Sequence, residues 1–195
     1  MRAGDFDSLR LHALKTHGGS ADRGTRPWRG TIAGGLGSLV LLAKQWALDG
    51  MEIETLKRQL IAMAAREKVY FVVDTLEYLH KGGRIGGAAR LVGSVLQIKP
   101  ILTVQNGQVE PFDKVRTQKQ ALAAIMEIDL SICKDNPDAH LTISHCAAED
   151  KAHRLKTHLE KELGISNIPV FVVPPAIVVH AGPGVITTSC FSAPE

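Results

Sequence analysis

The spacing of hydrophobic positions changes about one third of the way along the chain. From Gly34 to Leu48, and again from Ile53 to Glu67, apolar side chains recur at helical intervals. From Val69 onward, short apolar runs alternate with amphipathic segments. The pattern predicts two helices followed by a unit of alternating strands and helices.

The alternating unit predicts a mixed sheet. Strands are expected at 69–73, 100–104, 108–112, 141–144, 169–173 and 176–179, and helices at 88–97, 117–133 and 148–163. Asn106-Gly107 is a strong hairpin signal, and a hairpin requires antiparallel neighbours. The expected fold class is therefore α/β with a sheet that is not purely parallel.

The most informative segment begins with the β-branched and aromatic run Val69–Val73, which predicts a strand covered on both faces. Asp74 then occupies the expected N-cap of a short helix. Glu77 follows three residues later and would complete a capping box. These signals place a short helix directly after a buried strand.

Two glycines and an arginine follow that helix. Gly82 and Gly83 are expected to end it, because glycine enters the left-handed region without penalty. The next side chain is Arg84, whose forked donors suit a carboxylate or phosphate. The unit suggests an anion site on a rigid element; a surface arginine after an ordinary helix end is the alternative.

Histidines mark two further strand ends. His180 follows three apolar residues and precedes an Ala-Gly-Pro-Gly segment that lets the backbone turn closely around a bound group. A histidine can donate to a carboxylate in either protonation state, although a structural histidine is the alternative. Ser144 and His145 are adjacent on an expected strand and therefore point to opposite faces. No catalytic dyad is predicted there.

Composition narrows the classes of function. The net charge is +3, with basic and acidic residues interleaved, so no nucleic-acid footprint appears. No apolar run is long enough to span a membrane, and the first residues lack the apolar core of a signal peptide. Cys133, Cys146 and Cys190 are widely spaced, which fits reduced thiols in a cytoplasm better than a disulfide framework or a zinc site.

Several motifs occur in one order along the chain, at 81–85, 91–102, 107–111, 114–117, 143–145 and 180–184. This series closely resembles the DegV family of bacterial fatty-acid-binding proteins. The resemblance is clear over about 69–187, weaker over 35–67 and absent before about residue 30. It implies a DegV-like lipid-binding accessory protein rather than an enzyme, with no cofactor and no metal.

The resemblance also implies roles for three residues. Arg84 and His180 would face the carboxylate of a long-chain fatty acid. Arg116 would contact a partner, a fatty acid kinase subunit that phosphorylates that carboxylate. The apolar segments 92–101 and 170–179 would line an acyl tunnel, with plain core as the alternative.

The chain departs from the family pattern near its start. DegV-like proteins carry a full N-terminal α/β lobe with an Asp-Ser strand and a hydroxyl-rich loop, and neither motif is found in residues 1–30. We expect 1–30 to be irregular or disordered, 31–67 to be a helical remnant of that lobe, and 68–195 to form the DegV-like C-terminal lobe. A missing wall would expose apolar surface and favour self-association.

Two other classes of function compete with lipid binding. The first is a substrate domain distantly related to dihydroxyacetone kinases, in which His180 would form a covalent adduct. The absence of a P-loop glycine motif argues against nucleotide binding by this chain. The second is a remnant without lipid binding.

Overall fold

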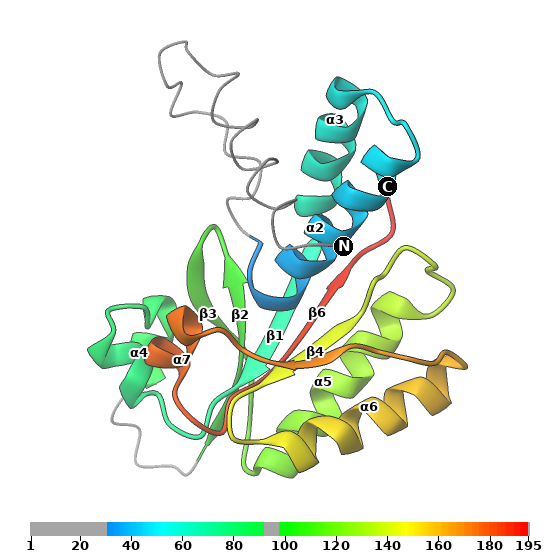
Figure 1. Cartoon of the computed structure of the whole chain (residues 1–195). Helices are drawn as coiled ribbons and strands as arrows, with labels where there is room; N and C mark the ends of the chain where they lie inside the picture. The colour runs from blue at the N-terminus through cyan, green and yellow to red at the C-terminus, as the bar shows by residue number, and fades with distance from the viewer. Residues whose placement is uncertain (1–30, 92–97, 195) are drawn as a thin grey trace, which may run out of the picture.

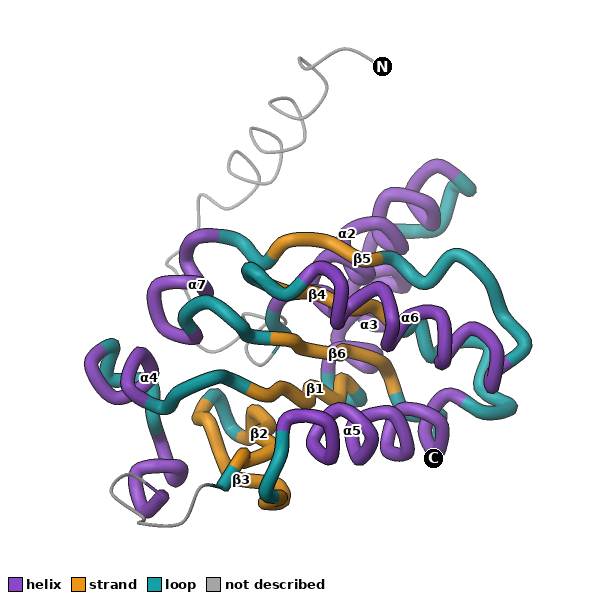
Figure 2. Tube along the Cα trace, turned by 90° about the horizontal axis from the view of Figure 1, so that it is seen from below, coloured by secondary structure: helices purple, strands orange, loops and turns teal. Residues whose placement is uncertain are grey.

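The computed structural model describes residues 31–91 and 98–194. In chain order its elements are α2 (Ala33–Leu48), α3 (Ile53–Ala64), β1 (Glu67–Val72), α4 (Glu77–Lys81), the 3₁₀ helix η1 (Gly86–Leu91), β2 (Lys99–Gln105), β3 (Gln108–Val115), α5 (Gln118–Cys133), β4 (Thr142–His145), α6 (Glu149–Leu163), β5 (Val170–Val172), α7 (Pro175–Ala181) and β6 (Ile186–Phe191). The described strands form one sheet in the order β3-β2-β1-β6-β4-β5 (Figures 1 and 2). Neighbours are antiparallel except β4 and β5, so the predicted α/β fold with a mixed sheet is confirmed.

Helices cover both faces of the sheet. On one face, α5 and α6 pack on a core that includes Val72, Ile101, Ile125, Ile143 and Ile186. On the other face, α2 and α3 enclose Phe191, while α4, η1 and α7 enclose a separate cluster around Phe71 and Val185. Figures 1 and 2 show α4 and α7 side by side at one end of the molecule. The described residues therefore form three layers: helices α5 and α6, the sheet, and the helices on the opposite face. Two separate apolar clusters lie between the sheet and the helices of that opposite face.

Local signals set most of the boundaries. Asn106 and Gly107 both have positive φ, as a tight hairpin turn between β2 and β3 requires. Thr117 caps α5 in a capping box with Gln120. The predicted helices at 117–133 and 148–163 and the predicted hairpin are confirmed.

Two local predictions are wrong. Residues 176–179 lie in helix α7 and not in a strand, because Pro175 sits in the first helical turn, where a missing N–H is harmless. Asp74 does not cap α4: the N-cap is Leu76, and the Glu77 amide donates to Thr75 Oγ1 (3.2 Å). The Asp74 carboxylate instead accepts a hydrogen bond from Gln118 Nε2 (3.1 Å).

Other boundaries shift. Helix α3 ends at Ala64, and β1 begins at Glu67, so the second predicted helix is too long. Of the helix predicted at 88–97, residues 88–91 belong to η1, and 92–97 lie outside the described residues.

Strand β6 has no counterpart among the predicted elements, although it is central to the sheet. It pairs with β1 on one side and β4 on the other, and all six of its residues are buried. Thr187, Thr188 and Ser189 interrupt its apolar pattern, so periodicity alone does not reveal it.

Helices α2 and α3 expose several large apolar side chains, among them Val40, Leu41, Leu48 and Ile53. Exposed apolar surface of this kind favours the self-association that the sequence predicts. The association itself stays a prediction. The proposed division at residue 67 likewise stays a prediction, and the expectation for 1–30 falls outside the described residues. Within the part of the chain that the structure describes, no helix is long and apolar enough to cross a membrane.

Candidate functional site: an apolar cavity beside α4 and α7

A cavity of about 720 Å³ lies on the sheet face opposite α5 and α6. Its floor includes Val69 and Phe71 of β1 and Thr187 of β6, and its walls include Leu79 of α4 and Ile177 of α7. The first residues of α2 and the β2–β3 turn complete the lining. The volume falls within the range of about 300–1,000 Å³ that is typical of small-molecule sites.

The lining of this cavity is mainly aliphatic. Its polar side chains are those of Arg84, Gln108, His180 and Thr187. An apolar body with a few polar groups suits a ligand that has a long apolar part and a small polar head. From the apolar segments expected to form a tunnel, Val173, Ala176 and Ile177 contribute to the lining.

Arg84 is presented by the end of α4. The Arg84 amide donates to Leu79 O (2.9 Å), and Gly83 adopts a left-handed φ of 63°. The predicted glycine helix end is thus confirmed at Gly83. The guanidinium is exposed and forms no ion pair with any residue that the structure describes. Its donors are therefore available to an anion in the cavity.

His180 reaches the cavity from the last turn of α7 and packs against Gly82. A Cβ atom on Gly82 would lie 2.3 Å from His180 Nδ1, although the Gly82 backbone itself is right-handed, with φ −77°. The prediction that Gly82 supplies a left-handed residue is therefore wrong. Gly82 allows close approach of the imidazole, whose Nδ1 is buried without a hydrogen-bond partner among the described residues.

In a second contact between these helices, the glycine follows α7 and the ring belongs to α4. Gly182 follows α7 with φ 75°, and a Cβ atom there would lie 2.3 Å from the Tyr78 ring of α4. Helices α4 and α7 are thus joined by two ring-on-glycine contacts. These contacts set the position of His180 relative to the Gly83–Arg84 turn.

The start of α2 forms one cavity wall through Ile32 and Ala33, and Glu67 fastens it to the sheet. The Glu67 carboxylate accepts hydrogen bonds from Ile32 N (3.2 Å) and Ser189 Oγ (2.7 Å). Burial raises the pKa of Glu67 to about 7, despite these two donors. The wall is therefore held by a carboxylate that changes charge near neutral pH.

Arg116 lies outside this cavity. It directly follows β3, whereas Gln108 and Val109, at the other end of the same strand, line the cavity. An eight-residue strand spans roughly 25 Å. The structure therefore brings Arg84 and His180 to one cavity and leaves Arg116 exposed at the opposite end of β3.

Ser144 and His145 are consecutive, buried residues of β4. Successive side chains of a strand point to opposite faces, so the geometry of β4 does not favour a direct side-chain hydrogen bond between them. Among the described residues, no group of three His, Cys, Asp or Glu side chains could hold a metal ion.

Two of the residues that line the cavity, Gln108 and Thr187, are not predicted from the sequence. Gln108 belongs to the recognised hairpin, but nothing in that signal says which side chain faces a ligand. Thr187 lies on the unpredicted strand β6. Its β-branched neighbours, Ile186 and Thr188, were the available signal for a strand at this position.

Comparison with known proteins identifies the class of this fold. A crystal structure of DegV from Bacillus subtilis, named there as a fatty acid binding protein, matches with a TM-score of 0.69 and 28% identity, over 81% of this chain and 57% of that one. A DegV family protein from Thermus thermophilus, whose structure is named for fatty acid binding, matches with a TM-score of 0.70 and 27% identity, over 96% of this chain and 66% of that one.

Sequence comparison leads to the same family. The family model described as "Uncharacterised protein, DegV family" matches residues 30–193. A DegV domain-containing protein of Streptomyces coelicolor is 37% identical over 158 residues, which are 80% of this chain and 56% of that relative. The chain therefore belongs to the DegV family, and it spans about half the length of the curated relatives it matches.

Proposed function

We propose that this protein binds a long-chain fatty acid, with Arg84 and His180 at the carboxylate and the acyl chain along the apolar cavity. One observation carries the proposal: these two residues, far apart in sequence, line the same largely aliphatic cavity. The names of the relatives from Bacillus subtilis and Thermus thermophilus support it, since both refer to fatty acid binding.

Different interactions would hold the acyl chain and the carboxylate of the bound fatty acid. Each methylene buried against residues such as Phe71 and Ile177 contributes about 0.8 kcal/mol, so the acyl chain supplies most of the affinity. The guanidinium of Arg84 can form two parallel hydrogen bonds with a carboxylate, which sets the orientation of the ligand.

Arg84→Ala is expected to weaken fatty-acid binding by about 1.5–3 kcal/mol, the usual contribution of a charge-assisted hydrogen bond. Titration with a fluorescent fatty acid measures this loss. Arg58→Ala is the matched control, because Arg58 is an exposed arginine on α3 that bonds only Thr55 Oγ1 among the described residues. Equal affinities for wild type and Arg84→Ala would remove Arg84 from the head-group site.

We further propose that the protein presents the bound carboxylate to a partner fatty acid kinase, with Arg116 in the contact. Arg116 is exposed and lies beyond the end of β3, so it is free to meet another protein without disturbing the cavity. Arginine is enriched at interface hot spots, and its charge raises the rate of encounter with an acidic surface.

Arg116→Glu is expected to leave fatty-acid affinity within twofold of wild type while lowering the rate of acyl-phosphate formation by a partner kinase. The charge reversal introduces local repulsion at the contact. Kinase turnover at limiting concentrations of this protein is the measurement, with Arg58→Glu as the control. Unchanged turnover for Arg116→Glu would contradict the docking role.

Native mass spectrometry of freshly purified protein separates this proposal from its alternatives. Lipid binding predicts a mass excess that matches a fatty acid. A covalent small-carbonyl adduct that is lost in His180→Gln would favour the dihydroxyacetone-kinase-like substrate domain. A bare chain that also fails to take up added fatty acid would favour a remnant without lipid binding.

A further inference from the structure

A second concave surface lies between the N-terminal halves of α5 and α6, remote from the cavity. This α5–α6 groove has a volume of about 530 Å³. Its apolar floor includes Leu122, Met126 and Leu155. Its rim includes the basic side chains Lys119, Lys151, Arg154 and His158. An apolar floor with a cationic rim differs from the mixed charge of the rest of the chain.

The two helices are parallel, so their N-termini lie at the same end of the groove. Strands β3 and β4, which precede α5 and α6, run in the same direction through the antiparallel pairs that separate them. Both helix N-termini therefore lie at the same edge of the sheet, and each carries a partial positive charge. Lys151 Nζ donates to Gln118 Oε1 and joins the two first turns.

The rim cations are not neutralised within the described residues. Lys119 and Arg154 form no ion pair with a described residue, and Lys151 bonds a neutral amide. The His158 ring lies against the Arg154 carbonyl, with 2.8 Å between His158 Nδ1 and Arg154 O. The Asp74 carboxylate reaches this end of the groove by accepting from Gln118 Nε2. Glu149 and Asp150 lie in the first turn of α6 but are not part of the groove lining. Within the groove lining, the charges of Lys119 and Arg154 are therefore available to a partner.

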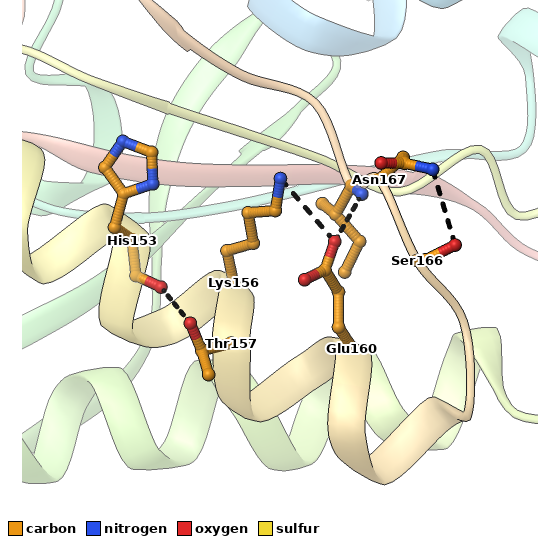
Figure 3. A network of polar contacts seen from close by, with 7 residues as sticks. His153, Lys156, Thr157, Glu160, Ser166 and Asn167 are labelled. Atoms are coloured by element: carbon orange, nitrogen blue, oxygen red, sulfur yellow. Dashed lines mark hydrogen bonds and ion pairs between the residues drawn. The ribbon is translucent and has the colours of Figure 1, made fainter.

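The adjacent side of α6 provides a contrast. Figure 3 shows Lys156 paired with Glu160 (3.6 Å), whose carboxylate also accepts from the Ile168 amide (2.9 Å) in the loop before β5. That stripe of α6 is neutralised and used for packing. Lys151, Arg154 and His158 line the groove instead, and none of them is paired with a carboxylate of a described residue.

We propose that the α5–α6 groove docks an acidic, amphipathic helix of a partner protein. Apolar side chains of that helix would fill the floor, where the flexible Met126 adapts to their shape, and its carboxylates would meet the rim. The concave form favours a helix over a flat bilayer, since a third helix packs into the space between two others. Arg116 directly precedes the N-cap of α5, so the inference rests on the proposal that this protein docks a partner through Arg116. It does not depend on the proposal that the cavity binds a fatty acid.

A fluorescein-labelled helical peptide with leucines on one face and glutamates on the other is the probe. Fluorescence anisotropy is expected to report binding that weakens with salt and that falls at least tenfold in Arg154→Glu. Ala123→Glu, at an exposed position in the groove, should have the same effect. Lys161→Glu is the matched control, because it reverses one charge on α6 outside the groove.

Three outcomes of the peptide titrations would overturn the proposal. The acidic peptide does not bind, a lysine counterpart binds equally well, or the two groove variants bind as tightly as Lys161→Glu. Vesicles containing anionic phospholipid, tested on the same variants, would overturn it if they bind through the groove and the peptide does not. Fatty-acid titrations of these variants report on the cavity alone, so a failure here is distinguishable from a failure of lipid binding.

Discussion

Replacing Asp129 with asparagine is expected to stabilise the protein by about 2–4 kcal/mol at pH 8 and to have a much smaller effect near pH 4. Asp129 lies on α5 and is fully buried against the sheet. Thr188 Oγ1 donates to its Oδ1 (3.1 Å), while Oδ2 has no partner among the described residues. Burial raises the pKa of Asp129 to about 8, from the 3.8 of an unperturbed group.

The sign of the effect follows from proton binding. The folded protein holds the Asp129 proton more tightly than the unfolded chain, so the stability associated with this group is complete below about pH 4 and is lost as the pH rises toward 8. Asparagine cannot ionise and removes this loss. Glu67, whose folded pKa is also raised, contributes a slope in the same direction that Asp129→Asn leaves in place.

Urea unfolding of both proteins at several pH values tests this prediction. Asp138→Asn, at an exposed position before β4, is the control and should not change the pH dependence. A wild-type stability that stays flat between pH 4 and 8, or that rises with pH, would contradict a protonated Asp129.

Gly182→Ala is expected to destabilise the protein by about 2–4 kcal/mol and to weaken fatty-acid binding with it. Two effects combine at this position. The backbone lies at φ 75° and ψ 176°, a region that is essentially restricted to glycine. The new Cβ atom would also lie 2.3 Å from the Tyr78 ring, so α4 and α7 would have to separate.

The chain offers a matched control for this glycine. Gly164 ends α6 at φ 65°, and a Cβ atom there would meet nothing within 4 Å, so Gly164→Ala should cost only about 1 kcal/mol. Tyr78→Ala combined with Gly182→Ala should recover the part that comes from the ring contact. Thermal unfolding gives the comparison, and equal losses for the two glycines would argue against the packing of Tyr78 on Gly182.

Local signals in the sequence indicate the helix end that carries Arg84, but they do not indicate the element that carries His180. Gly83 and Arg84 occupy the helix end that the local signals indicate, and this part of the site needed no tertiary information. His180 lines the cavity from a helix and not from the end of a strand. The run Ile177–Val179 is too short for its periodicity to separate strand from helix, and Pro175 in the first helical turn decides the outcome.

The remaining features depend on contacts between distant segments. Gly82 matters because the ring of His180 lies against it, and no local pattern records that contact. Thr187 became a cavity residue because β6 is enclosed by β1 and β4, so its hydroxyl-bearing side chains are buried despite their polarity. The position of Arg116 at the other end of β3 likewise follows from the hairpin register, which a motif does not give.

The central place of β6 has a consequence for synthesis on the ribosome. Strands β1, β2 and β3 can pair as soon as they emerge, and β4 and β5 can pair later as a separate group. Until residues 186–191 leave the exit tunnel, β1 and β4 each present an open edge, and open edges invite pairing with other chains. The nascent protein therefore remains exposed to misassembly from the emergence of β1 until the emergence of β6, which joins the two halves of the sheet.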